Sequence, residues 1–207
     1  FPPVLEIRNA KEAENYGAEL EARILPLRGW APRPIEGLEL SGTFGWLHGE
    51  YLDFQSAIER QVGSQILRIP IDFSGKALQN SPRYKVSATA EWTLDLGPRW
   101  GSLAPRYDMN WSDDVFFDAS EGRGTVEFKG FQEQLPEYAI GQKALFLHHV
   151  RLAYRTPTGN VEVAGFVRNL TDEVYKNFAF DAASFSGVVI NFVGEPRTYG
   201  VELTIAF

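Results

Sequence analysis

The 207-residue sequence contains no cysteine, one methionine and three histidines, and it has no long apolar run. Without cysteine, the chain has neither a disulfide framework nor a thiolate metal site. No segment reaches the roughly eighteen apolar residues of a membrane-spanning helix. The formal charge of −7 argues against a nucleic-acid partner, because such proteins carry basic patches. The mean hydropathy of −0.22 is typical of soluble proteins, but membrane strands also give low values because they alternate apolar and polar residues.

The most regular stretch is the end of the sequence, residues 197–207. Residues of one parity are apolar, and those of the other parity are small or polar. The apolar set is Tyr199, Val201, Leu203, Ile205 and Phe207. A period of two over nine residues predicts a strand with two different faces. Because this strand finishes on an aromatic residue, we expect its apolar face to contact lipid.

Alternation of the same kind recurs along the chain. The predicted strands are residues 9–27, 38–51, 83–96, 103–117, 146–154, 161–170 and 197–207, with approximate ends. Most have ten or more residues, whereas strands of globular proteins usually have about five or six. Tilted strands that cross a membrane need about nine to eleven residues. The aromatic content of 14% and the nineteen glycines are also high for a soluble domain of this size.

The connections between these seven strands alternate in length. The short connections are 26–34, 97–101 and 156–160, and the long ones are 53–81, 118–142 and 171–196. Outer-membrane barrels have short turns on the periplasmic side and long loops outside. The sequence therefore predicts an all-β protein, a transmembrane antiparallel β-barrel whose long connections are extracellular.

Seven strands do not close a barrel, because single-chain bacterial barrels have even strand numbers from about eight upward. An open edge in lipid leaves backbone groups unsatisfied. Either an eighth strand lies near Val4–Arg8, or the chain is the carboxy-terminal part of a larger barrel, which is the preferred alternative. Residues 1–4 lack the basic start and apolar core of a signal peptide, so we expect a mature protein or a part of one.

Several segments resemble TonB-dependent outer-membrane receptors. Residues 167–175 contain RNLTD, which in that family precedes the last loop, and residues 194–207 contain PRTYG, which opens the last strand. Residues 9–21, 37–42 and 72–83 look like further segments of the family. The resemblance follows the family's order and covers essentially the whole chain.

This resemblance implies that residues 1–207 are the C-terminal portion of a 22-stranded barrel with a plugged lumen. The plug domain and the short box that engages TonB are not recognised in this chain. The implied function is TonB-dependent transport of a scarce nutrient, most often a ferric siderophore, across the outer membrane of a Gram-negative bacterium. No reaction is catalysed and no cofactor is expected.

The resemblance also implies a set of partners. These are the remainder of the barrel and the plug, TonB with its inner-membrane motor proteins, the barrel-assembly machinery, outer-membrane lipid and a small-molecule ligand. In the family the terminal aromatic strand is the assembly signal, which assigns that role to Tyr199, Val201, Leu203, Ile205 and Phe207.

Two other functions remain as alternatives. A small passive pore or a structural barrel protein is expected if the chain closes a barrel by itself. An outer-membrane enzyme such as a lipase is less favoured, because the sequence has no Ser/His/Asp order and no nucleophile elbow.

The last long connection is unusually aromatic. Phe178, Phe180, Phe185 and Phe192 offer a wall on which an aromatic or apolar ligand stacks. Packing among neighbouring loops explains the same residues, and it is the preferred interpretation.

Two groups resemble metal ligands. His148 and His149 are adjacent in a predicted strand, so they point to opposite faces and do not chelate one ion together. Four carboxylates could hold Ca²⁺ through oxygen ligands, although a solvated loop is the preferred interpretation. They are Asp113, Asp114, Asp118 and Glu121.

The remaining distinctive residues are assigned by the face of their strand. Aromatic residues on the apolar faces are expected to form lipid-facing or interfacial girdles. They are Trp46, Trp92, Tyr107, Trp111, Tyr154 and Tyr199. Charged residues on the other faces are expected to line the lumen, which contacts the plug in the family. They are Glu19, Glu21, Arg23, Lys85, Glu91, Arg106 and Arg151.

Overall fold

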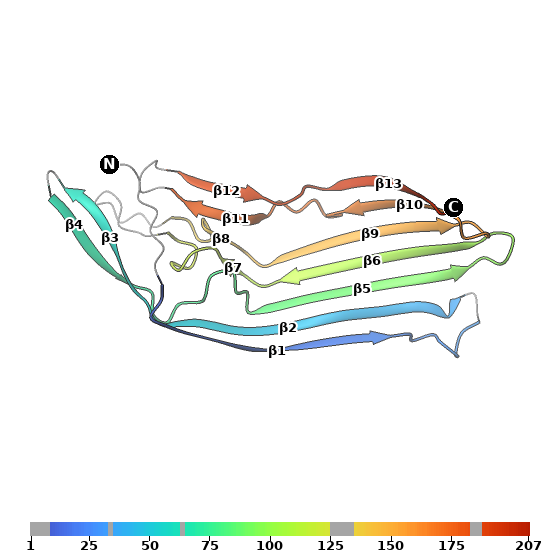
Figure 1. Cartoon of the computed structure of the whole chain (residues 1–207), viewed down its shortest axis with the longest axis horizontal. Helices are drawn as coiled ribbons and strands as arrows, with labels where there is room; N and C mark the ends of the chain where they lie inside the picture. The colour runs from blue at the N-terminus through green and yellow to red at the C-terminus, as the bar shows by residue number, and fades with distance from the viewer. Residues whose placement is uncertain (1–8, 33–34, 63–64, 125–134, 183–187) are drawn as a thin grey trace.

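Seven long strands form one antiparallel sheet in the computed structural model (Figure 1). The structure describes residues 9–32, 35–62, 65–124, 135–182 and 188–207. The sheet order is β1-β2-β5-β6-β9-β10-β13, so each strand pairs with the next long strand along the chain. The bounds are β1 Glu12–Ile24, β2 Gly37–Asp53, β5 Tyr84–Asp95, β6 Ser102–Ser112, β9 Leu145–Arg155, β10 Val161–Arg168 and β13 Thr198–Ile205. The predicted all-β fold with seven antiparallel strands is confirmed.

The register places apolar residues side by side across the sheet. Val86 of β5 pairs with Trp111 of β6, which in turn pairs with Phe146 of β9. At the far edge, Val163 of β10 pairs with Leu203 of β13. Side chains alternate between the two faces of a strand, so these rows share one face, which we call the apolar face.

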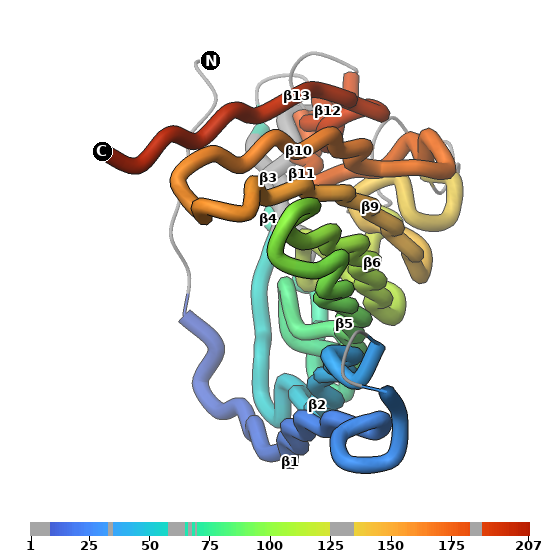
Figure 2. The backbone as a smooth tube through the Cα atoms, turned by 90° about the vertical axis from the view of Figure 1, so that its right-hand side faces the viewer, coloured from blue at the N-terminus to red at the C-terminus, as the bar shows by residue number. Residues whose placement is uncertain are grey.

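The opposite face, which we call the polar face, carries charged rows. Glu91 of β5 pairs with Arg106 of β6, and Arg106 pairs with Arg151 of β9. Figure 2 shows the sheet end-on as an arc that runs from β1 to β13. Such an arc with one apolar and one polar face is the geometry of a barrel wall.

The apolar face is open to its surroundings in this chain. Leu20 and Val201 are 65% and 77% exposed. Soluble monomers rarely leave a continuous apolar surface of this extent uncovered. The face therefore requires lipid or another apolar partner to cover it.

Three short two-stranded sheets lie at one end of the long sheet, in or beside the long connections (Figure 1). They are β3 Gln55–Val62 with β4 Gln65–Asp72, β7 Val115–Phe116 with β8 Gly141–Gln142, and β11 Lys176–Asp181 with β12 Val189–Val193. Of these six short strands, only Val115–Phe116 lies within a predicted strand, the segment 103–117, and the sequence pattern did not identify the other five. The tight turns lie at the opposite end, which we call the turn end, and the other is the hairpin end.

One predicted strand is too long. The segment 103–117 leaves the sheet after Ser112, and the next strand, β7, pairs with β8 instead. The carboxylate of Asp114 accepts a hydrogen bond of 2.7 Å from the backbone N–H of Ala144, which draws the chain towards the hairpin end.

Two small buried clusters hold the hairpin end together. Phe54 and Phe73 flank the β3–β4 hairpin and pack with Ala119. Phe117 and Ala179 pack with Ile140, which is 1% exposed. Within the described residues, no helix is long and apolar enough to cross a membrane.

Candidate functional site

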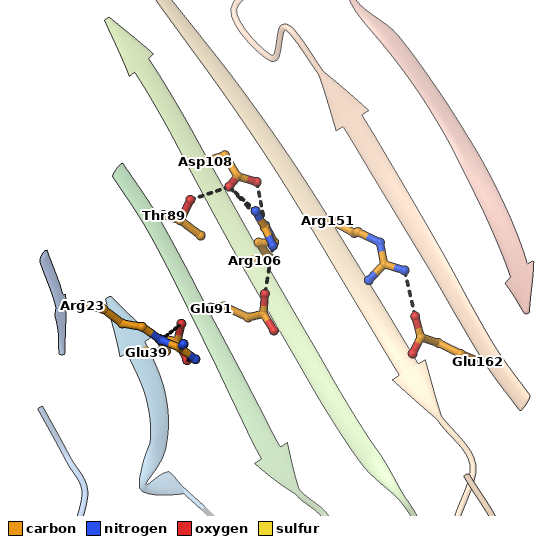
Figure 3. Close-up of polar contacts among 8 residues, drawn as sticks. All are labelled: Arg23, Glu39, Thr89, Glu91, Arg106, Asp108, Arg151 and Glu162. Carbon is orange, nitrogen blue, oxygen red and sulfur yellow. Dashed lines mark hydrogen bonds and ion pairs between the residues drawn. The ribbon is translucent and has the colours of Figure 1, made fainter. Parts of the chain in front are cut away.

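Ion pairs run across the polar face of the sheet (Figure 3). Arg23 of β1 contacts both carboxylate oxygens of Glu39 on β2, at 2.6 and 2.7 Å. Arg106 of β6 donates to Asp108 at 2.8 Å and to Glu91 of β5 at 3.1 Å. Each of the two guanidinium groups thus makes more than one hydrogen bond or ion-pair contact with its carboxylate partners. Charged groups paired in this way form the strongest hydrogen bonds.

The same pattern continues on the last three strands. Arg151 of β9 donates to Glu162 of β10 at 2.8 Å and to Glu202 of β13 at 3.3 Å. Arg155 also donates to Glu162, at 2.8 Å. These side chains are partly exposed, so each pair adds little stability. Their main effect is to give the polar face a fixed pattern of charges, which we call the charge ladder.

The sequence identified only half of the charge ladder. The register confirms the polar-face placement of Glu19, Glu21, Arg23, Lys85, Glu91, Arg106 and Arg151. It adds the partners Glu39, Asp108, Glu162 and Glu202. The alternation also placed these partners on the polar faces, but which arginine meets which carboxylate depends on the register.

The aromatic residues assigned to girdles lie on the apolar face. The set is Trp46, Trp92, Tyr107, Trp111, Tyr154 and Tyr199. The hydroxyl of Tyr107 lies 2.7 Å from Nδ1 of His148, and the indole N–H of Trp92 donates to the carbonyl of Ile35 at 2.8 Å. Polar atoms of these rings thus find partners, while the ring bodies remain available to lipid.

The terminal strand forms the free edge of the sheet beside β10. Tyr199, Val201, Leu203 and Ile205 lie on the apolar face, with 81%, 77%, 63% and 48% of their surfaces exposed. Phe207 follows the strand and is also exposed. Among the described strands the terminal strand pairs only with β10, so it offers an uncovered apolar row and one open backbone edge.

The motifs RNLTD and PRTYG contact each other. Asn169 is 3% exposed, and its side-chain N–H groups donate to the carbonyls of Glu173 at 2.9 Å and Glu195 at 3.1 Å. Asp172 accepts a hydrogen bond of 3.0 Å from the backbone N–H of Arg197 and forms an ion pair with its side chain. The two motifs thus form one structural unit, which joins the end of β10 to the start of β13.

The aromatic connection forms the β11–β12 hairpin. Phe178 pairs with Phe192 across the hairpin, with ring centroids 5.9 Å apart, and its ring lies 5.8 Å from that of Phe117. Phe178 and Phe192 are 41% and 55% exposed, and Phe180 is half-buried. Phe185 lies outside the described residues. The described rings therefore both pack together and present an open aromatic surface at the hairpin end.

The four carboxylates considered as calcium ligands have separate internal partners. Asp113 accepts from the N–H of Asp114, and Asp114 accepts from Tyr138 and Ala144. Asp118 accepts from Ser120 and Gly122, and Glu121 accepts from Ala77. These carboxylates hold loops in place through hydrogen bonds. Within the described residues, the four do not come close enough together to share one metal ion.

Burial and hydrogen bonding shift the pKa values of three groups near the hairpin end. Burial raises the pKa of Asp118, although hydrogen bonds from Ser120 and Gly122 oppose the shift. The hydrogen bond to Asp114 raises the pKa of Tyr138 to about 12. Burial lowers the pKa of Lys176, whose ammonium donates to a backbone carbonyl at 3.2 Å.

The two adjacent histidines have different surroundings. His148 contacts Tyr107 and stacks on Phe146, with ring centroids 6.1 Å apart, on the apolar face. His149 accepts a hydrogen bond of 3.1 Å from the backbone N–H of Asn169. Their ring nitrogens serve different parts of the structure, as the alternation of strand side chains predicts.

Comparisons with known proteins agree with this geometry. The family model described as "TonB dependent receptor-like, beta-barrel" matches residues 2–170. Among curated proteins, no sequence matches the chain.

Two solved structures share the fold. The ferric yersiniabactin uptake receptor FyuA from Yersinia pestis superposes with a TM-score of 0.63 at 20% identity, over 94% of this chain and 24% of that receptor. The siderophore receptor PiuA from Acinetobacter baumannii gives a TM-score of 0.59 at 14% identity, over 92% of this chain and 21% of that receptor. The chain thus spans about a quarter of the length of these receptors, and it belongs to the TonB-dependent receptor β-barrel family.

Proposed function

We propose that the chain is the C-terminal wall of a TonB-dependent receptor that imports a scarce nutrient across the outer membrane of a Gram-negative bacterium. One observation supports this most directly: a seven-stranded curved sheet has a continuous apolar face on one side and the charge ladder on the other. A barrel wall needs lipid on its outer surface and a polar lumen inside. In this proposal residues 1–207 belong to the barrel domain, and the plug lies elsewhere in the protein.

The wall contributes binding surfaces rather than chemistry. The charge ladder presents its carboxylates and guanidinium groups to the lumen, where a plug can form ion pairs with them. The loops and the plug capture the ligand, and TonB, driven by the inner-membrane motor, rearranges the plug for passage. The remainder of the barrel pairs with the open edges of β1 and β13, because unpaired backbone groups in lipid are costly.

A ferric siderophore is the ligand class that we propose. One of the similar structures is described as a ferric yersiniabactin uptake receptor and the other as a siderophore receptor, which supports the class without identifying the compound. The exposed rings of Phe178 and Phe192 would contact the ligand at the extracellular mouth, together with Phe180 and Phe185. Aromatic walls with few polar groups are common in such sites.

Uptake of a panel of radiolabelled ferric siderophores by cells that carry the full-length receptor tests this function. We expect uptake of at least one compound, which stops when TonB is removed. Phe178→Ala with Phe192→Ala should weaken binding of that compound, whereas Val174→Ala, at another exposed apolar residue, should not. Uptake that continues without TonB would instead indicate a passive pore, and no uptake of any compound would contradict the ligand class.

The terminal strand is proposed to serve assembly as well. Its exposed row of Tyr199, Val201, Leu203, Ile205 and Phe207 is suited to binding by the barrel-assembly machinery, because it combines apolar side chains with a free backbone edge. Phe207→Ser should reduce the amount of receptor in the outer membrane without changing the affinity of the assembled fraction. Unchanged levels in quantitative immunoblots of membrane fractions would contradict this role.

A further inference from the structure

Three potential metal ligands meet across the first two strands, outside the features assigned above. Glu14 lies on β1, and His48 and Glu50 lie two residues apart on β2. In the register Glu14 pairs with Glu50, and Tyr16 pairs with His48. The parity of Tyr16 places all three ligands on the same side as the apolar face, near the start of β1 and the end of β2.

The spacing of these groups suits a small cation. Nε2 of His48 lies 3.2 Å from Oε1 of Glu14 and 3.5 Å from Oε2 of Glu50. One ligand atom of each residue lies within 4.8 Å of the other two. Around a tetrahedral Zn²⁺ ion with bonds of about 2.0–2.1 Å, neighbouring ligand atoms are about 3.3 Å apart. The three side chains thus need only small movements to share one ion.

The charges of the group also favour a cation. Glu14 and Glu50 face each other directly across the ladder, a position in which like charges destabilise a strand pair. Among the described side chains, His48 is the basic group that both carboxylates contact. A neutral imidazole does not offset two negative charges, whereas a divalent ion between them would.

Aromatic neighbours restrict the orientation of the imidazole. The ring of Tyr16 lies 4.8 Å from that of His48, and Trp46 meets Tyr16 edge-on at 6.0 Å. This contact orients Nε2 towards the carboxylates. The side chains of Glu14, His48 and Glu50 remain 42%, 31% and 35% exposed, so an ion can reach them from solvent.

We propose that Glu14, His48 and Glu50 form a binding site for a divalent transition-metal ion, for which Zn²⁺ is the probe. One imidazole with two carboxylates suits Zn²⁺ and its neighbours, whereas Ca²⁺ and Mg²⁺ take oxygen ligands. The ion fastens the start of β1 to the end of β2. A fourth position on the ion stays open to water or to an anionic group from the surroundings.

A protonated His48 that bridges the two carboxylates is the competing explanation, and pH separates the two. Acidification favours the charged imidazolium form of histidine, so the ion pair would strengthen at lower pH. Metal binding requires the neutral imidazole, so it strengthens as the pH rises. The two explanations therefore predict opposite pH responses at the same strand pair.

Hydrogen exchange of the full-length receptor in detergent, with EDTA or with Zn²⁺, tests the site. At pH 7.5 we expect Zn²⁺ to slow exchange in residues 12–16 and 48–53, by up to about 100-fold when its concentration is a hundred times the dissociation constant. The effect should shrink at pH 5.5. Isothermal titration should find one Zn²⁺ site fewer in His48→Gln than in the unchanged receptor.

Two further variants serve as controls, one for misfolding and one for Zn²⁺ binding at other histidines. Glu14→Gln removes the repulsion with Glu50, so this strand pair should exchange at least as slowly as in the unchanged receptor in EDTA, yet lose its response to Zn²⁺. His148→Gln removes another histidine of the apolar face and should keep the full response. Two results would overturn the proposal. One is that His48→Gln and Glu14→Gln keep the Zn²⁺ response and the Zn²⁺ stoichiometry of the unchanged receptor. The other is that, in the unchanged receptor, exchange slows at pH 5.5 without metal and does not respond to Zn²⁺ at pH 7.5.

Discussion

Asn169 combines deep burial with a left-handed backbone conformation. Its φ angle is 49°, it is 3% exposed, and its amide group makes three hydrogen bonds. Asparagine tolerates this conformation better than most residues, because its short polar side chain bonds locally. These properties explain the asparagine of the RNLTD sequence.

Replacing Asn169 should loosen the unit that it forms with the PRTYG segment. Asn169→Ala removes the amide that donates to the backbone carbonyls of Glu173 and Glu195, and it strains the backbone, so we expect a loss of about 2–4 kcal/mol in local stability. Hydrogen exchange of residues 170–175 and 195–198 measures this loss. Asn169→Gly should lose less, because glycine adopts the left-handed conformation freely. Asn191→Ala, at an exposed position of β12, is the control and should leave the exchange unchanged.

Asp118 should make the hairpin end sensitive to pH. Burial raises its folded-state pKa above the ordinary value of 3.8, so the folded loop keeps the proton at pH values where the unfolded loop has released it. This contribution to stability is fully present below pH 3.8 and declines as pH rises through the folded pKa. Asp118→Asn should remove this part of the decline and stabilise the loop at neutral pH.

The measurement for Asp118 is hydrogen exchange of residues 117–124 at several pH values, corrected for the intrinsic exchange rate at each pH. Glu137→Gln, at an exposed carboxylate of the same region, is the control and should keep the pH dependence of the unchanged protein. An identical pH profile for Asp118→Asn and the unchanged protein would show that Asp118 does not have this role.

The terminal strand offers a direct comparison between the two faces of the sheet. Leu203 lies on the apolar face opposite Val163, and Thr204 lies on the polar face opposite Glu162. Leu203→Arg should therefore cost about 2–4 kcal/mol near mid-membrane. Thr204→Arg should cost much less, because the new guanidinium lies on the polar face opposite the carboxylate of Glu162. Refolding of the full-length protein into lipid measures both, and equal losses would contradict the assignment of the faces.

The sequence predicted the long strands well because each carries a sustained period of two. In β5, for example, Val86 and Trp92 alternate with charged residues such as Lys85 and Glu91. A two-faced sheet requires such a pattern, so the strand positions and their faces are readable without a structure. The fold class and the seven strands of the sheet followed from this one property.

The features that the sequence did not predict depend on contacts between distant segments. The β3–β4 hairpin was missed because Gln55–Val62 mixes polar and apolar residues without a long alternation. The partners of Arg106 and Arg151 depend on register, which alternation does not specify. The Glu14–His48–Glu50 group joins residues 34 positions apart and also needed the register to be found.

The two ends of the sheet differ across the whole molecule. The strand pairs β3–β4, β7–β8 and β11–β12 gather at one end, and the tight turns after β5 and β9 lie at the other (Figure 1). The terminal residue Phe207 lies at the turn end. In a receptor barrel the hairpin end would be extracellular and the turn end periplasmic. The orientation follows from the whole arrangement rather than from any single residue.

The absence of cysteine from these 207 residues allows this orientation to be tested with single introduced thiols. Arg68→Cys and Asn177→Cys place exposed thiols at the hairpin end, and Arg99→Cys and Thr158→Cys place them in the tight turns. In intact cells a bulky, impermeant maleimide should label the first pair, because those residues would face the medium. The turn variants should react only after the outer membrane is permeabilised, and that later labelling is their control for thiol reactivity. If the turn variants were labelled in intact cells and the hairpin variants were protected, the orientation would be the opposite of the proposed one. The hairpin end would then not lie on the side from which the ligand enters.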